Sequence, residues 1–293
     1  MSAPTSPLHR WYLLGATVLL LFTLGLLQPG VRDVVLQDGA VYQALLAGLV
    51  AAAATAAGTV PVLVSRTISE RTVDTLMGFG AGVMLAASAF SLVGPALEAA
   101  TELGAGRWGA GFTVGLGLLL GAGLLLAIDR MVPHEHFVKG PEGGRKSRLR
   151  RAWLFVFAIA LHNIPEGLAI GVAFAGTDAL AASALTTGIA IQNIPEGLIV
   201  AVALRAVGYG RLHSAAIGIA SGLLEPVGAV LGAAVVSLSS VLLPWGLAFA
   251  AGAMLFVVSH EIIPESHRKG HEHQATAGLM LGFAMMVVIV GAF

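Results

Sequence analysis

The chain has 293 residues, of which 57% are hydrophobic and only 11% charged, and its mean hydropathy is +0.87. Soluble domains are about 45–50% apolar and about 25% charged, so this composition excludes an ordinary soluble domain. Lys and Arg together number 16, as do Asp and Glu, which argues against a nucleic-acid partner. The absence of cysteine excludes disulfides and thiolate metal ligands.

Long apolar runs follow one another along the whole chain. A transmembrane helix needs about 20 mostly apolar residues, and these runs lack the alternating pattern of a membrane β-barrel. We therefore expect an all-α, polytopic bundle of membrane-spanning helices. The nine predicted spans are Trp11–Leu27, Val41–Val64, Thr75–Leu97, Trp108–Ile128, Ala152–Phe174, Ser183–Leu204, Ser214–Leu238, Val241–Val258 and Ala275–Phe293.

The first span follows His9 and Arg10, as the apolar core of a signal peptide would. Its run is long for such a peptide, and no small-residue cleavage site follows at 28–33, so an uncleaved helix is favoured. With nine spans and a cytoplasmic N-terminus, the inner side holds every Lys and Arg except Arg32 and Arg107. This distribution agrees with the positive-inside rule and places the C-terminus outside.

The longest loop, Met131–Arg151, is then cytoplasmic. Its basic, Gly-rich part, from Gly140 to Arg151, is typical of a flexible linker. No loop is long enough to form a soluble domain.

Ionisable side chains occur in the middle of three consecutive spans. They are His162 and Glu166 in the fifth span, Glu196 in the sixth and Glu225 in the seventh, and none of these spans contains Lys or Arg. Each charge at the bilayer centre costs about 2.5–3.5 kcal/mol on insertion scales. A protonated structural glutamic acid is an alternative for Glu225 alone. For the three acids together, the compensating charge must come from protons or a bound cation.

The fifth and sixth spans share a motif, HNIPEGL from His162 and QNIPEGL from Gln192. Residues four apart lie on one helix face, so each motif directs its first residue and its glutamate the same way. At about 1.5 Å per residue, both motifs and Glu225 lie about 15–17 Å deep, near the bilayer midplane. The three spans can therefore converge on one site, flanked by Asn163 and Asn193.

Each motif also contains a proline. The rings of Pro165 and Pro195 push away the carbonyls of Leu161 and Ile191, and these oxygens could serve as ligands lining a cavity. The alternative is an ordinary structural kink.

The donor types favour a particular class of ion. Imidazole with carboxylate suits zinc and its first-row neighbours, whereas calcium does not need imidazole and a monovalent ion does not need three acids. We expect a divalent transition-metal site, holding one ion or two ions bridged by Glu166 and Glu196. Because these groups must lose protons to bind metal, binding should depend on pH.

At these residues the chain resembles the ZIP (Zrt-/Irt-like) family of metal transporters. The resemblance is carried by HNIPEGLAIGVAFA, IQNIPEGL and SGLLEP, and extends to MGFGAGVMLAASAFS and AAGAMLFVVSHEIIPE. It implies that residues 41–293 form an eight-helix transporter domain, and that residues 1–40 add an N-terminal helix and an outer loop. It also implies an elevator-type motion, often within a homodimer.

The resemblance further implies a binuclear centre. A first ion would be bound by Met84, His162, Glu166 and Glu196, and Met84 would favour soft ions such as cadmium besides zinc. Some related members carry Asp where this chain has Asn193, and the amide removes a negative charge from the second site. That second ion would be bound by Asn163, Glu166, Gln192, Asn193, Glu196 and Glu225.

Four residues are expected along the route of the ion. Asp74 and Ser91 match polar positions of the family's transport pathway. His260 and Glu261, at the inner end of the eighth span, are candidates for the cytoplasmic exit. For Asp74 and Ser91 the alternative is a solvated helix end or ordinary packing. A further group, His134 to His136, lies in the long cytoplasmic loop, and a solvated loop with ordinary histidines is the alternative for this group and for the exit residues.

An intramembrane metalloprotease would need H-E-x-x-H, which does not occur in the chain. A metal sensor is disfavoured because no soluble output domain is present. A divalent-selective channel remains the alternative, although a site with many ligands binds tightly and tight binding slows conduction. The sequence thus predicts a non-enzymatic transporter carrying chiefly zinc, with cadmium, iron(II) and manganese as other candidates, across a bacterial inner membrane into the cytoplasm.

Overall fold

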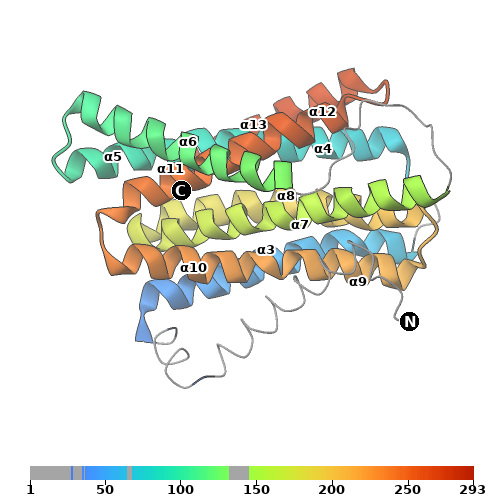
Figure 1. The fold of residues 1–293 in the computed structure, drawn as a ribbon, viewed down its shortest axis with the longest axis horizontal. Helices are drawn as coiled ribbons and strands as arrows, with labels where there is room; N and C mark the ends of the chain where they lie inside the picture. The colour runs from blue at the N-terminus through green and yellow to red at the C-terminus, as the bar shows by residue number, and fades with distance from the viewer. Residues whose placement is uncertain (1–27, 29–34, 36, 65–67, 132–144) are drawn as a thin grey trace.

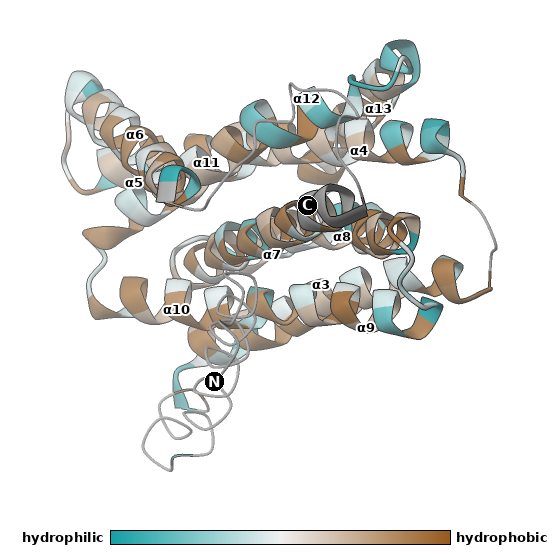
Figure 2. Cartoon of the chain, turned by 45° about the vertical axis from the view of Figure 1, so that its right-hand side comes forward, coloured by the Kyte–Doolittle hydropathy of each residue, from teal (hydrophilic) through white to brown (hydrophobic). Residues whose placement is uncertain are grey.

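The computed structural model describes residues 28, 35, 37–64, 68–131 and 145–293, and these residues form helices without any strand. Figure 1 shows long helices running roughly alongside one another, and Figure 2 shows apolar residues over most of their length, with hydrophilic residues gathered near helix ends. The prediction of an all-α, polytopic membrane protein is confirmed.

Eight helical segments of the described chain are long and apolar enough to cross a membrane. They correspond one to one to the second to ninth predicted spans, while Trp11–Leu27 lies outside the described residues. The third span is longer than predicted, running from Glu70 to Glu102, and the eighth continues to Ser266 instead of ending at Val258. The helices are α3 (Gly39–Val64), α4 (Glu70–Ala86) with η1 (Ala87–Val93) and α5 (Gly94–Glu102), α6 (Arg107–Met131), α7 (Arg145–Gly176), α8 (Ala179–Ala206), α9 (Arg211–Gly222) with α10 (Leu224–Leu238), α11 (Leu242–Val257) with η2 (Val258–Ile262) and α12 (Ile263–Ser266), and α13 (Glu272–Ala292).

Two of the spans contain a π-helical turn, which the sequence analysis did not anticipate. Each is followed by a proline, Pro95 after η1 and Pro264 after η2. Proline has no N–H, and its ring clashes with the carbonyl four residues earlier. A wider turn relieves that clash: the Gly94 and Ile263 N–H groups bond five residues back, to the carbonyls of Ala89 and Val258.

The predicted seventh span is broken at Leu223 into α9 and α10. Pro226 lies in the first turn of α10, where a missing N–H costs little. The break puts Glu225 in that same first turn, so the carboxylate lies at the positive end of a helix dipole. By contrast, α7 and α8 continue through Pro165 and Pro195.

The long loop is shorter than predicted, because α7 begins at Arg145 rather than at Ala152. Residues 145–151 were expected to belong to a flexible linker. They are Arg, Lys, Ser and Leu, and most of these residue types favour helix, so they extend the apolar helix by two turns.

The helices divide into two groups by how closely their backbones approach. We call α3, α7, α8, α9 and α10 the bundle, and the remaining helices the scaffold. A methyl group added to Gly228 would lie 2.6 Å from the carbonyl oxygen of Ile164, so α10 and α7 touch backbone to backbone inside the bundle. Similar contacts join α6 to α11 and α4 to α13 inside the scaffold, as at Gly252 and Gly282.

Contacts between bundle and scaffold are of a different kind. The described glycines at this boundary face side chains instead of backbone: Gly188 faces Met286, Gly246 faces Val172 and Gly80 faces Gln192. Side-chain contacts can rearrange, whereas interlocked backbones cannot slide past one another without separating.

Candidate metal centre

The polar residues of the two NIPEGL motifs meet at the contact between α7 and α8. Glu166 is 1% exposed, Asn163 and Asn193 are fully buried, and Gln192 is 2% exposed. The i, i+4 spacing places the residues of each motif on one helix face, and the break before α10 brings the fully buried Glu225 beside them.

Amide groups link the carboxylates into one hydrogen-bonded chain. Gln192 Nε2 donates to Glu166 Oε1 at 2.6 Å and to Asn193 Oδ1 at 2.6 Å, with Glu196 Oε2 at 3.4 Å. Asn193 Nδ2 donates in turn to Glu225 Oε2 at 2.9 Å. All three acids predicted from the sequence are therefore brought together, with an amide between each pair.

Four polar atoms of this cluster are buried without a hydrogen-bond partner among the described residues. They are both amide atoms of Asn163, Glu166 Oε2 and Glu196 Oε1. An unsatisfied buried polar atom costs about 1–3 kcal/mol, and more when charged. Nearly all such atoms in proteins have a partner, so four together point to an ion or water as the missing one.

No basic side chain compensates these acids in the described part of the chain, where none of the three forms an ion pair with Lys or Arg. Gln192 and Asn193 contribute neutral amides. Among the same described residues, no three His, Asp or Glu side chains lie close enough together to hold a metal ion in this conformation. The amides separate the carboxylates, and an amide that turned its oxygen inward would become a ligand instead of a spacer.

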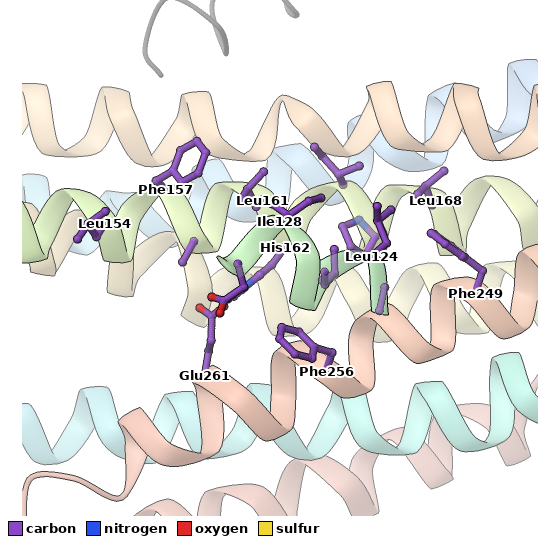
Figure 3. Close-up of a pocket in the computed structure, with 16 residues that line it drawn as sticks. Leu124, Ile128, Leu154, Phe157, Leu161, His162, Leu168, Phe249, Phe256 and Glu261 are labelled. Carbon is purple, nitrogen blue, oxygen red and sulfur yellow. Dashed lines mark ion pairs between the residues drawn. The ribbon is translucent and has the colours of Figure 1, made fainter. Parts of the chain in front are cut away.

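His162 reaches from α7 toward the scaffold. Its Nε2 lies 3.2 Å from Glu261 Oε1, which belongs to η2. Figure 3 shows these two side chains facing one another at the edge of a mostly apolar pocket of about 100 Å³ between α6, α7 and α11, whose lining also includes Asp129.

A second cavity, of about 40 Å³, connects the centre with this pair. Its lining includes His162, Gln192, Glu196 and Glu261, together with apolar residues of α4, α7 and α8. A water molecule needs at least about 10–15 Å³, so this cavity has room for water or an ion among four polar side chains.

The wide turn of η2 directs neighbouring residues to different helices. Glu261 meets His162 of α7, whereas His260 lies 3.7 Å from Asp129 Oδ2 of α6 and stacks on Phe256. Sequence reasoning selected His260 and Glu261 but missed Asp129, whose only signal was a charge at the end of the fourth span.

Met84 is buried in α4 at 1% exposure. It follows Gly80 by one turn, and a methyl group added to Gly80 would lie 3.5 Å from Gln192 Oε1, so this face of α4 is directed toward α8. Ser91 lies further along, half-buried within η1.

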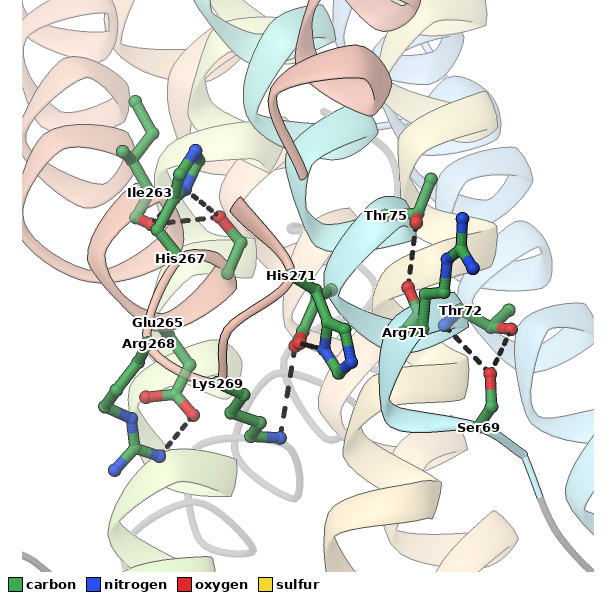
Figure 4. Close-up of polar contacts among 12 residues, drawn as sticks. Ser69, Arg71, Thr72, Thr75, Ile263, Glu265, His267, Arg268, Lys269 and His271 are labelled. Atoms are coloured by element: carbon green, nitrogen blue, oxygen red, sulfur yellow. Dashed lines mark hydrogen bonds and ion pairs between the residues drawn. The ribbon is translucent and has the colours of Figure 1, made fainter. Parts of the chain in front are cut away.

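Asp74 does not join the centre. It is fully buried at the start of α4, where its Oδ2 lies 2.8 Å from His271 Nδ1 and its Oδ1 lies 4.0 Å from Lys269 Nζ. Figure 4 shows Lys269 and His271 in the segment that joins α12 to α13, where Arg268 also pairs with Glu265 of α12. The structure therefore places Asp74 in the attachment of that segment to α4.

Thr55 of α3 contacts the centre and was not anticipated. Its hydroxyl donates to Glu225 Oε1 at 2.8 Å. A threonine in an apolar helix carries no sequence signal of such a role.

Comparison with known proteins gives one consistent result. The family model described as "ZIP Zinc transporter" matches residues 139–290. The chain is 48% identical to the zinc transporter ZIPB of Bordetella bronchiseptica over 84% of its own length and 80% of that protein. It is 47% identical to the zinc transporter GufA of Myxococcus xanthus and 33% identical to human ZIP11, each over 84% of this chain and 96% of the relative.

The chain belongs to the ZIP family. Membership confirms the resemblance found in the sequence and makes the protein a multi-pass membrane transporter rather than an enzyme. The ZIP family match includes α7, α8 and α10, which supply all the acids of the centre. It begins at residue 139 and therefore does not include Met84.

Proposed function

We propose that this ZIP protein carries zinc across the membrane through the polar cluster of α7, α8 and α10. The observation that carries this proposal is the set of four unpartnered polar atoms on Asn163, Glu166 and Glu196. They lie among acids that have no basic partner within the described ranges, in the middle of helices long and apolar enough to span a membrane. A divalent cation supplies both the missing charge and the missing partners. The relatives that carry the name of zinc transporter support the choice of ion.

The first ion is bound by His162, Glu166 and Glu196 together with the thioether of Met84. Imidazole and sulfur favour zinc and cadmium, while the carboxylates also accept iron(II) and manganese. The second ion uses Glu225 and the amides beside it. Because Asn193 is neutral, this second position is the weaker one.

The ion leaves the centre toward η2. His162 belongs to the proposed first ligand set, yet it faces Glu261 at 3.2 Å. The His162 side chain turns from Glu166 to Glu261 and so transfers the ion toward the cytoplasmic side. His260 and Asp129 are the next polar side chains on this route. Transport is directed inward, in a bacterial inner membrane with the N-terminus in the cytoplasm and the C-terminus outside.

The bundle moves as a rigid unit against the scaffold in an elevator-type motion. Backbone contacts through glycine hold each group together, whereas the described glycines at the boundary face side chains. This division favours a transporter over a divalent-selective channel, the alternative that the same acidic site would allow. The resemblance implies that two copies form a homodimer.

Uptake of zinc into proteoliposomes containing a zinc indicator tests the proposal. The double variant Glu166→Ala/Glu196→Ala should lose saturable uptake, because the remaining ligands cannot hold the ion. Glu102→Ala/Glu272→Ala removes the same number of acids from exposed helix ends and should transport like the wild type. Undiminished uptake by a folded Glu166→Ala/Glu196→Ala variant would overturn the proposal. Repeating the assay with cadmium, iron(II) and manganese ranks the ions.

A further inference from the structure

Glu225 is the one acid of the centre whose two carboxylate oxygens each accept a short hydrogen bond. Thr55 Oγ1 donates to Oε1 at 2.8 Å, and Asn193 Nδ2 donates to Oε2 at 2.9 Å. Both donors are buried, Thr55 at 1% exposure and Asn193 at 0%. The carboxylate is therefore fixed from two sides, whereas Glu166 and Glu196 each keep an oxygen that has no hydrogen-bond partner among residues 37–64, 68–131 and 145–293.

The position of Thr55 is itself tightly determined. A methyl group added to Gly222, at the end of α9, would lie 2.8 Å from Thr55 Cβ. Gly197 of α8 approaches the backbone of Thr55 from another side. These contacts leave the threonine little freedom to move. Its hydroxyl is therefore held beside Glu225, which follows the break between α9 and α10.

The hydroxyl has two acceptors within reach. In helices, threonine commonly bonds the carbonyl four residues earlier, and here the oxygen of Ala51 lies 3.4 Å from Oγ1. Glu225 Oε1 is closer, at 2.8 Å. Hydrogen bonds to a carboxylate are shorter and about twice as strong as bonds between neutral groups. The hydroxyl proton is thus directed at Glu225.

We propose that Thr55 is a positioning residue of the metal centre, whose hydroxyl orients the Glu225 carboxylate toward the transported ion. The inference rests on the function proposed above. Each carboxylate oxygen has two lone pairs, so one hydrogen bond per oxygen leaves one lone pair per oxygen for the ion. Groups that hydrogen-bond to a metal ligand fix its orientation, and their loss typically lowers metal affinity about 10- to 100-fold.

The variant Thr55→Val removes the hydroxyl and keeps the branched shape, while Thr55→Ser keeps the hydroxyl. In the proteoliposome assay we expect Thr55→Val to raise the KM for zinc about 10-fold, at the lower end of that range, with the maximal rate changed less than about two-fold. Thr55→Ser should restore the KM. Equilibrium binding of zinc to the detergent-purified protein should weaken by the same factor.

Thr59→Val is the matched control. Thr59 lies one turn along α3, is also 1% exposed, and donates to the carbonyl of Ala56 in its own helix. It should leave the KM unchanged. A Thr55→Val variant with wild-type KM would overturn the inference, as would a Thr55→Ser variant as weak as Thr55→Val. Failure of the proposed function gives a different result, because the wild-type protein would then take up zinc no better than the Glu166→Ala/Glu196→Ala variant.

Discussion

At the scale of single residues, Asn193 sets how much negative charge the centre carries. Its amide accepts from Gln192 and donates to Glu225, so it occupies the space between two acids without adding a charge. An aspartate there would accept only, and its carboxylate would face the Glu225 carboxylate at about the present 2.9 Å. Two carboxylates so close repel one another unless a cation lies between them.

This argument predicts the behaviour of Asn193→Asp. In the presence of a chelator the variant should unfold at a lower temperature than wild type, and zinc should raise its unfolding temperature by more than it raises that of wild type. Thermal unfolding in detergent measures both. Gln43→Glu, which adds one acid at an exposed position of α3, should show neither effect. A variant that zinc stabilises no more than wild type would contradict the role given to Asn193.

Most residues of the centre could be predicted from the sequence, because a charge inside a membrane helix is costly and therefore informative. His162, Glu166, Glu196 and Glu225 stand out for that reason alone. Thr55 and Asp129 do not: a threonine is common in membrane helices, and a charge at a helix end is ordinary. The turn of His162 toward Glu261 depends on a contact between helices that no local pattern specifies.

At the scale of helices, close backbone contact is what holds the bundle together. Gly228 of α10 packs on α7, and an added methyl group would meet Ile164 O at 2.6 Å and Leu168 N at 3.0 Å. Gly123 of α6 has nothing within 4 Å of the same position. The first glycine is therefore packed against another helix, whereas the second has open space where a side chain would lie.

Gly228→Ala should therefore destabilise the protein by about 1–3 kcal/mol, the usual cost of overpacking. Gly123→Ala should be neutral or slightly stabilising, since alanine favours helix by up to about 1 kcal/mol over glycine. Chemical or thermal unfolding in detergent compares them. Equal stability of the two variants would show that the α7–α10 contact is looser than the structure indicates.

Helix positions followed from hydropathy, and their ends were predicted to within a few residues for most spans. The interruptions were harder. Pro95, Pro226 and Pro264 mark η1, the α9–α10 break and η2, respectively. Pro165 and Pro195 lie inside helices that continue. Proline thus signals strain in the hydrogen-bond ladder, while the packing around it decides whether the helix kinks, widens or breaks.

At the scale of the whole molecule, the proposed elevator-type motion requires the bundle to slide against the scaffold at their boundary. The chain contains no cysteine, so introduced pairs can be cross-linked without background. Gly188 of α8 faces Met286 of α13 across that boundary. Gly218 of α9 faces Thr59 of α3 inside the bundle, with an added methyl group 2.7 Å from Thr59 Cγ2.

Oxidation of Gly188→Cys/Met286→Cys should stop zinc uptake, and a reductant should restore it, because the disulfide ties the bundle to the scaffold. Oxidation of Thr59→Cys/Gly218→Cys should leave uptake intact. The uptake assay and a gel-shift measure of cross-linking report the two outcomes. Full transport through a completely cross-linked Gly188–Met286 pair would contradict the sliding motion and favour the channel.

The central claim is that a divalent ion binds among the acids of α7, α8 and α10, which have no basic partner in the part of the chain that the structure describes. Anomalous diffraction at the zinc absorption edge, from crystals grown with zinc, tests it most directly. We predict the strongest peak about 2.0–2.2 Å from carboxylate oxygens of Glu166 and Glu196, the usual zinc–oxygen distance. Strong peaks confined to the loop histidines, with none among these acids, would contradict the account.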